Sequence, residues 1–142
     1  MSNFGTEGYV VDTSAWIEFF RDSKQGADTK EIIYYKSEET ITPSIVLAEF
    51  KHKYIKTDYD EAKFLSDLQT IENLSRIENI TKSHSIKAGE LRAKYYKKKK
   101  REISFIDCII IAVGQELDYT VVSTDENFDK IPNCKWLGTP VD

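Results

Sequence analysis

Apolar and polar positions follow two different periods along the chain. Short β-branched or alternating runs predict strands at residues 9–11, 40–42, 74–80, 119–123 and near 135–137. Helical spacing predicts helices at residues 15–20, 25–36, 43–56, 60–71, from 81 or 83 to 95 with fraying into 97–101, and 103–113. Strands that alternate with helices indicate a mostly parallel sheet with helices on both faces. We therefore expect an α/β fold, with residues 1–142 forming one domain.

Two of the predicted helices have informative residues at particular positions. Thr42 and Pro43 predict a helix start with the threonine as cap and the proline in the first helical position. The stretch 103–113 is apolar on nearly every side but contains Asp107. A helix of that kind is normally buried, and aspartate is rarely buried without a partner. Asp107 should therefore lie at a rim that water reaches, or opposite a cation.

Composition sets limits on the kind of protein. With 40% hydrophobic and 31% charged residues, the chain is typical of a folded domain. Its longest apolar run is too short to span a membrane. Cys108 and Cys134 form no C-x-x-C motif, so we interpret them as core thiols of a cytoplasmic protein. The net charge of −4 does not by itself suggest a nucleic-acid partner.

Four acidic residues are candidates for chemistry, and each also has a purely structural interpretation. Asp12 could cap the helix that follows it. Asp107 could form a capping box with Ser104, three residues earlier. Asp125 lies in a polar turn, where aspartate commonly binds its own backbone. Glu49 interrupts an apolar helix and could belong to a polar stripe along it.

Taken together, the four acids favour a shared site. Asp12 and Asp125 both follow the carboxyl end of a predicted strand, where open α/β sheets form ligand crevices. Glu49 and Asp107 lie in apolar helices that must pack on that sheet. Converging carboxylates repel one another and need a cation to offset the repulsion. Because no histidine or cysteine accompanies them, a hard ion such as Mg²⁺ or Mn²⁺ fits best, and phosphodiester chemistry with it.

Two basic stretches, 51–56 and 94–101, interleave cations with aromatic residues and could hold an RNA backbone. Solvated helix ends favoured by the helix dipole are the structural alternative. The predicted RNA-binding residues are Lys51, Lys53, Lys97, Lys98, Lys99, Lys100 and Arg101. His52 and His84 are predicted to be surface residues, and no Ser–His–Asp or Cys–His arrangement is supported.

An ordered set of short motifs resembles the PIN-domain ribonucleases, and among them the VapC toxins of toxin–antitoxin pairs. The matching stretches are Val10-Val11-Asp12-Thr13-Ser14-Ala15, Leu47-Ala48-Glu49-Phe50, Ser104-x-x-Asp107-x-x-Ile110-x-Ala112 and Ser123-Thr124-Asp125-x-x-Phe128. They span nearly the whole chain. No single motif is specific, but the ordered set is. Two departures are Ser123, where the family often has threonine, and a few extra residues before the first strand.

The resemblance implies a PIN-like three-layer fold and a specific assignment of residues. The family's metal-binding quartet falls on Asp12, Glu49, Asp107 and Asp125. Supporting hydroxyls would come from Thr13 or Ser14, Ser104 and Ser123. The resemblance further implies Mg²⁺- or Mn²⁺-dependent cleavage of RNA, a homodimer, and neutralisation by a small cognate antitoxin protein.

Two alternatives remain open at this point. The chain could be a PIN-type nuclease that processes RNA and has no antitoxin. It could also be a non-catalytic RNA-binding module in which the acids are only helix caps. Antitoxin contacts are not located by the sequence, and the aromatic residues expected to be exposed on the early helices, Trp16, Phe19 and Phe20, are the candidates.

Overall fold

The computed structural model describes residues 8–99 and 103–138. Five strands form one sheet in the order β3-β2-β1-β4-β5, and every neighbouring pair is parallel. The strands are β1 (Gly8–Val11), β2 (Glu39–Pro43), β3 (Arg76–Glu78), β4 (Thr120–Ser123) and β5 (Cys134–Trp136). The predicted α/β class with a parallel sheet is confirmed.

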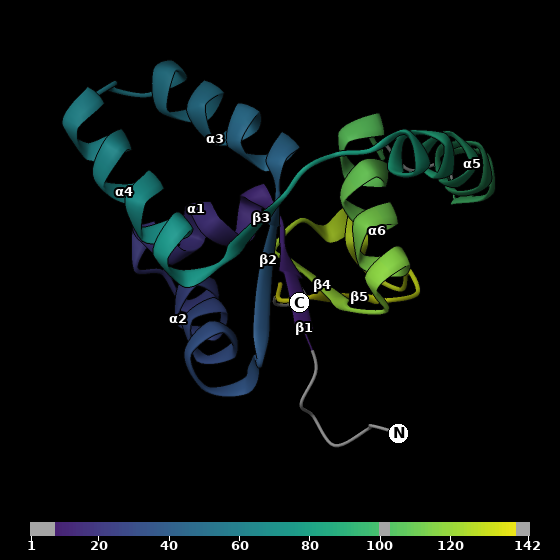
Figure 1. Ribbon diagram of the computed structural model, residues 1–142, viewed down its shortest axis with the longest axis horizontal. Coiled ribbons are helices and arrows are strands. Elements are labelled where there is room, and N and C mark those ends of the chain that lie inside the picture. The colour runs from purple at the N-terminus through teal and green to yellow at the C-terminus, as the bar shows by residue number, and fades with distance from the viewer. Residues whose placement is uncertain (1–7, 100–102, 139–142) are drawn as a thin grey trace.

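Helices cover the sheet on both faces (Figure 1). One group is α1 (Thr13–Arg21), α2 (Lys24–Glu31) with the π-helical turn η1 (Ile32–Lys36), α3 (Ser44–Lys56) and α4 (Glu61–Leu74). The other group is α5 (Lys82–Lys99) and α6 (Phe105–Leu117), and a short 3-10 turn, η2 (Glu126–Phe128), follows β4. α6 packs on β1 and β4, and α5 packs along α6. Two helical layers therefore enclose the sheet.

The strand order places a topological switch between β1 and β4. From β1 the chain continues to β2 and β3 on one side, whereas β4 and β5 lie on the other. Val11 pairs with Val122, and the Asp12 N–H continues the pairing to the Val122 carbonyl at 3.2 Å. In open parallel sheets, ligand crevices form where neighbouring strands diverge in this way. The carboxyl ends of β1 and β4 are thus the expected place for a site.

The core lies between the sheet and its helices. Its largest fully buried side chains include Trp16 and Phe50 on one face and Ile110 and Ile111 on the other. Gly114 allows α6 to approach β4 closely, since a Cβ there would lie 2.5 Å from Val121 Cγ2. The stretch around Asp107 is therefore a packed core helix, as its sequence indicates.

The predicted start of α3 is wrong by one residue. Pro43 is the last residue of β2 and the N-cap of α3, with extended backbone angles and no side-chain cap. The Thr42 hydroxyl cannot serve as the cap because it is used elsewhere. It accepts from Trp16 Nε1 at 3.1 Å and lies 2.7 Å from the Ser75 hydroxyl. The Thr42 hydroxyl therefore makes tertiary hydrogen bonds to Trp16 and Ser75 in place of the predicted capping bond to α3.

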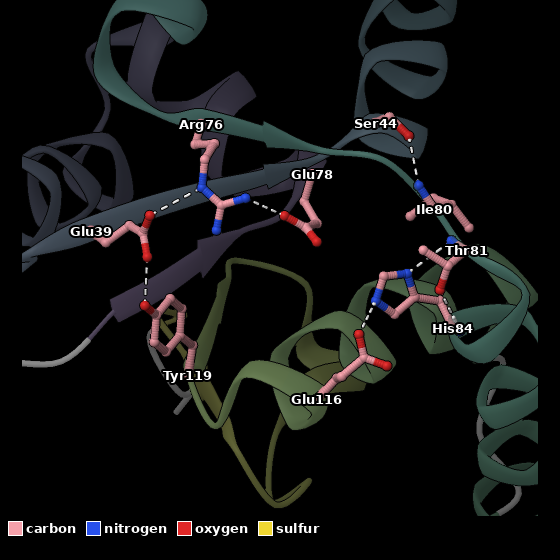
Figure 2. Close-up of polar contacts among 9 residues, drawn as sticks. All are labelled: Glu39, Ser44, Arg76, Glu78, Ile80, Thr81, His84, Glu116 and Tyr119. Atoms are coloured by element: carbon pink, nitrogen blue, oxygen red, sulfur yellow. Dashed lines mark hydrogen bonds and ion pairs between the residues drawn. The ribbon is translucent and has the colours of Figure 1, made fainter.

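Several other element boundaries differ from prediction, and two of the differences have a visible local cause. The strand expected at 74–80 covers only Arg76–Glu78, because Leu74 closes α4 and the Ser75 N–H still donates to Ile71. The helix expected at 25–36 changes to a π-helical turn at Ile32. Figure 2 shows how the short β3 is tied to the sheet: Arg76 binds Glu39 of β2 at 3.0 Å and also contacts Glu78.

His84 is buried, with 1% of its surface exposed, and the prediction of a surface residue is wrong. The imidazole Nδ1 of His84 accepts from the Thr81 backbone N–H at 3.0 Å, and the His84 backbone N–H donates to Thr81 Oγ1 at 3.2 Å (Figure 2). The imidazole thus takes the place of glutamate in a capping box at the start of α5. Nε2 lies 2.9 Å from Glu116 Oε1 on α6 but out of line for a hydrogen bond, so this contact is electrostatic.

Replacing His84 with alanine is expected to lower the free energy of unfolding by about 2 kcal/mol. The change removes a helix cap and leaves the Thr81 N–H without its acceptor. Glu116→Gln is the matched control, because the Glu116 side chain is 46% exposed and its loss of charge should cost little. Urea denaturation of both variants checks this. Equal stability of His84→Ala and wild type would contradict the assignment.

Both cysteines are free thiols held in apolar surroundings. Burial raises the pKa of Cys108 to about 11 and that of Cys134 to about 12, so neither is a nucleophile near neutral pH. None of the helices within residues 8–99 and 103–138 is long and apolar enough to cross a membrane.

Candidate acidic active site

All four predicted acids line one pocket of about 220 Å³ at the carboxyl ends of β1 and β4. Asp12 follows β1 and Asp125 follows β4, while Glu49 reaches the pocket from α3 and Asp107 from the first turn of α6. Residues that are far apart in the chain therefore meet where the topology predicts a crevice. The remaining lining residues are Thr13, Ser14, Ile17, Glu18, Arg21 and Lys53.

Asp12 is both an N-cap and a wall of the pocket. Its Oδ1 accepts from the Ala15 N–H at 2.9 Å and from the Ser14 hydroxyl at 2.9 Å. Ser14 Oγ also accepts from the Thr124 N–H at 3.0 Å and lies 3.2 Å from Ser123 Oγ. One serine thus joins the loop after β1 to the loop after β4, which fixes Asp12 relative to the second loop.

Asp107 forms the predicted capping box with Ser104. Its Oδ2 accepts from the Ser104 N–H at 3.2 Å, and the Ser104 hydroxyl accepts from the Asp107 N–H at 3.0 Å. Asp125 is held in the same manner: it accepts from the Asn127 N–H at 2.9 Å and donates its own N–H to Ser123 Oγ at 2.9 Å. The structural interpretations of these acids are correct, and the same acids line the pocket.

Glu49 is the acid for which the sequence suggests no cap. Its Oε1 accepts from the Thr13 hydroxyl at 2.6 Å, and Thr13 itself is buried at the start of α1. This bond links α3 to α1 across the pocket. Of the predicted hydroxyls, Thr13 supports Glu49 and Ser14 supports Asp12, while Ser104 and Ser123 hold the backbone around the other two acids.

The electrostatics of the pocket disfavour negative charge. Burial raises the pKa of Asp12 to about 7, and hydrogen bonds from Ser123, Ala15 and Ser14 oppose this only in part. Burial likewise raises the pKa of Asp107 to about 6, with further repulsion from Asp125 and Glu49. Repulsion from Asp107 also acts on Asp12. Burial and mutual repulsion therefore both oppose the ionisation of Asp12 and Asp107.

The donor set fits a hard cation, although the present side-chain positions do not enclose one. Within the described part of the chain, no three His, Cys, Asp or Glu side chains are placed to hold a single metal ion. Each acid is turned toward its own hydrogen-bond donor instead. Four carboxylates without sulfur or imidazole match the oxygen ligands that Mg²⁺ or Mn²⁺ prefers.

Three lining residues were not predicted from the sequence: Ile17, Glu18 and Arg21 of α1. They follow Ser14 at spacings of three, four and seven residues, so a helical projection from the Asp12 cap would have placed them on the same face. Arg21 Nη1 lies 3.2 Å from Glu18 Oε2, and 65% of the Arg21 side chain is exposed. A cation thus stands beside the acids.

The predicted RNA-binding residues are separated by the fold. Lys53 lines the acidic pocket. Lys51 instead turns to α4, where it pairs with Glu61 Oε1 at 3.0 Å and lies 4.1 Å from the centre of the Phe64 ring. Lys97, Lys98 and Lys99 continue α5, so the predicted fraying of that helix does not begin at Lys97. Lys100 and Arg101 lie outside the described residues.

The aromatic residues of α1 are not the exposed surface that the sequence suggested. Trp16 is fully buried and Phe19 is 6% exposed, and both belong to the core. Phe20 is half-buried and stacks against the Trp16 ring with centroids 6.1 Å apart. Trp16 and Phe19 therefore offer no free surface to a partner protein.

The parallel sheet thus gathers acidic side chains at its switch point between β1 and β4. Residues 9–133 match the PIN domain family, and the chain belongs to that family. No curated protein matches the sequence at a significant level.

Solved structures with the same fold come from toxin–antitoxin systems. VapBC2 from Rickettsia felis, solved with a DNA fragment from its promoter, is 21% identical with a TM-score of 0.71, covering 91% of this chain and 96% of that one. A toxin–antitoxin complex from Klebsiella pneumoniae is 17% identical with a TM-score of 0.70, covering 91% and 97%. VapC20 from Mycobacterium tuberculosis, a toxin that cleaves the sarcin–ricin loop, is 20% identical with a TM-score of 0.65, covering 82% and 87%.

Proposed function

We propose that this PIN domain is a metal-dependent endoribonuclease and the toxin of a toxin–antitoxin pair. The observation that carries the proposal is the meeting of Asp12, Glu49, Asp107 and Asp125 in one pocket at the sheet's switch point. The family, and solved structures of toxins with the same fold, support it. The reaction would be hydrolysis of an RNA phosphodiester.

The four carboxylates would hold Mg²⁺ or Mn²⁺. When bound, such an ion stabilises charge on a phosphoryl group and makes water a better nucleophile. The raised pKa values of Asp12 and Asp107 mean that protons compete for the same oxygens near neutral pH. Binding of the ion should therefore release protons and should weaken as the pH falls below about 7.

The chain's own residues have two further tasks in this reaction. Arg21 and Lys53 line the acidic pocket and would offset the repulsion between the carboxylates and an RNA backbone. Ser14 and Thr13 keep Asp12 and Glu49 oriented through their hydroxyls. One of the acids would then accept a proton from the attacking water, as general-base catalysis requires.

A small antitoxin protein and a second copy of the chain are the proposed partners. The solved structures with this fold include toxin–antitoxin complexes from Klebsiella pneumoniae and Rickettsia felis. The two free thiols are consistent with our inference that the protein works in the reducing cytoplasm. Co-expression with a small protein encoded beside it should suppress RNA cleavage. A nuclease that needs no such partner would instead favour a role in RNA processing.

Cleavage of a structured RNA mixture is expected to require Mg²⁺ or Mn²⁺ and to stop in EDTA. Asp107→Asn should lower the rate about 100-fold, or about 2.7 kcal/mol of transition-state stabilisation, because one ligand loses its charge. The protein is first freed of any small partner that co-purifies. Rates for wild type and variant are measured with the same RNA.

Asp118→Asn is the matched control for this experiment. Asp118 is the left-handed C-cap at the other end of α6, where asparagine is also well tolerated. It should cut RNA at the wild-type rate. If wild type and Asp107→Asn are equally inactive yet both bind RNA in a salt-dependent way, the chain is a binding module and the nuclease proposal is wrong.

A further inference from the structure

Two exposed aromatic rings stand on either side of the connection from α5 to α6. Phe105 and Tyr96 are 57% and 48% exposed. The Arg92 guanidinium carbon lies 4.5 Å from the centre of the Tyr96 ring and 4.8 Å from that of Phe105. Arg92 Nε also donates to the Ile103 carbonyl at 2.6 Å. Single exposed rings are common on protein surfaces. Here the Arg92 guanidinium is held in place and contacts both rings, so that the three side chains form one continuous surface.

Phe105 lies within one helical turn of Asp107, which lines the acidic pocket. Phe105 is the first residue of α6, directly after Ser104 and two residues before Asp107. The distance along the helix between Phe105 and Asp107 is less than one turn, which rises about 5 Å. Successive residues at this spacing point to different sides of a helix. Phe105 therefore faces Arg92 on α5, whereas Asp107 faces the pocket.

We propose that Phe105, Tyr96 and Arg92 form a stacking platform for an unpaired RNA base next to the phosphodiester that is cut. The inference rests on the proposed ribonuclease function and adds a substrate contact to it. Aromatic side chains bind unpaired bases through their faces, and arginine adds a cation–π contribution. Arg92 covers one face of the Phe105 ring, and more than half of the Phe105 surface still faces solvent.

The charges around the platform favour RNA as its occupant. Arg92 lies over the rings themselves, and the exposed Lys94 follows on the same helix. The acidic pocket beside it would repel a phosphate backbone, so contacts to the bases are a natural source of affinity. The bond from Arg92 to the Ile103 carbonyl already ties α5 to the residue before the N-cap of α6, and Phe105 need not be exposed for that purpose.

Binding of a fluorescein-labelled single-stranded octaribonucleotide tests the platform. Anisotropy is measured in EDTA, so that cleavage and binding are separated. Phe105→Ala is expected to raise Kd about tenfold, as the loss of one stacked base does. Phe105→Trp should bind at least as tightly as wild type. Tyr35→Ala is the control, since Tyr35 is 84% exposed on η1, among the helices of the other group.

A scan of abasic nucleotides through the same RNA distinguishes stacking from a structural role. At one position, removal of the base should weaken wild type about tenfold and leave Phe105→Ala unchanged. Equal losses for Phe105→Ala at every position, or an unchanged Kd, would overturn the platform. An unchanged Kd together with a shift from dimer to monomer would assign the rings to contact between copies instead. Absence of RNA cleavage with the coupling intact would leave the platform standing and remove the proposed activity.

Discussion

Asp12→Asn is expected to raise the free energy of unfolding of the metal-free protein by about 4 kcal/mol at pH 8. Burial raises the pKa of Asp12 from 3.8 to about 7, and each unit corresponds to about 1.36 kcal/mol. Between about pH 4 and 7 the unfolded chain has released this proton and the folded chain has kept it. The free energy of unfolding therefore falls as the pH rises through this window. Above about pH 7 the full destabilisation from the ionised, buried Asp12 remains.

Asparagine removes that cost and keeps the local structure. Its side-chain oxygen can accept from the Ala15 N–H and from Ser14, as Asp12 does now. Urea denaturation in EDTA at pH 8 and at pH 4.5 measures the gain, which should largely vanish at the lower pH. Asp58→Asn, at an exposed acid, should change stability little at either pH. A variant no more stable than wild type at pH 8 would show that Asp12 is not destabilised by its burial.

Added Mg²⁺ should narrow the difference in stability between the two proteins, and should reverse their order above about 1,000 times Kd. A ligand that binds only the folded state stabilises it in proportion to the logarithm of its concentration over Kd. Wild type should gain stability with Mg²⁺, and Asp12→Asn should gain much less. Under the proposed function, the pocket would thus trade stability of the free protein for affinity toward a cation. Cleavage by Asp12→Asn should be lost even though the variant is the more stable protein.

Trp16→Ala is expected to lower the free energy of unfolding by about 3–5 kcal/mol, as is typical of a large aromatic side chain removed from a core. Trp16 is fully buried on α1, and its backbone N–H donates at 3.1 Å to the carbonyl of Asp12, the N-cap of that helix. Its ring contacts those of Phe19 and Phe20. The variant should lose both stability and RNA cleavage, because the helix that presents the first acid loses its anchor.

Trp16→Phe separates packing from hydrogen bonding at this position. Phenylalanine retains most of the apolar surface but cannot donate to Thr42 Oγ1, which Trp16 Nε1 contacts at 3.1 Å. We expect a loss of about 1–2 kcal/mol. Chemical denaturation followed by circular dichroism suits both variants, since one of the two tryptophans is removed. Equal losses for Ala and Phe would show that the hydrogen bond, and not the packing, dominates.

The sequence was sufficient to locate the four acids because the two facts that bring them together are local. Asp12 and Asp125 follow strand ends, and parallel strands end at one edge of a sheet. A helix cap and a pocket-lining side chain are not exclusive roles for one acid. A carboxylate has several lone pairs, so Asp107 accepts from its own helix and still lines the pocket.

What the sequence could not supply depends on how helices dock. Lys51 and Lys53 look alike in the chain, but α4 lies against Lys51 and removes it from the pocket. His84 is buried because α6 places Glu116 beside it. The Thr42 hydroxyl is taken by Trp16 and Ser75, which are 26 and 33 residues away. Such contacts have no signature in local periodicity, so no pattern in the sequence indicates them.

An aspartate codon becomes an asparagine codon through a single G-to-A change, and asparagine satisfies the same backbone N–H groups that Asp12, Asp107 and Asp125 satisfy now. The acidic pocket can therefore be silenced in one mutational step without loss of the fold. Under the proposed toxin function, we expect cells selected to survive this protein to yield full-length alleles with one asparagine beside frameshifts and deletions. Such alleles would lose the proposed RNA cleavage and keep the surface that the proposed partners would recognise.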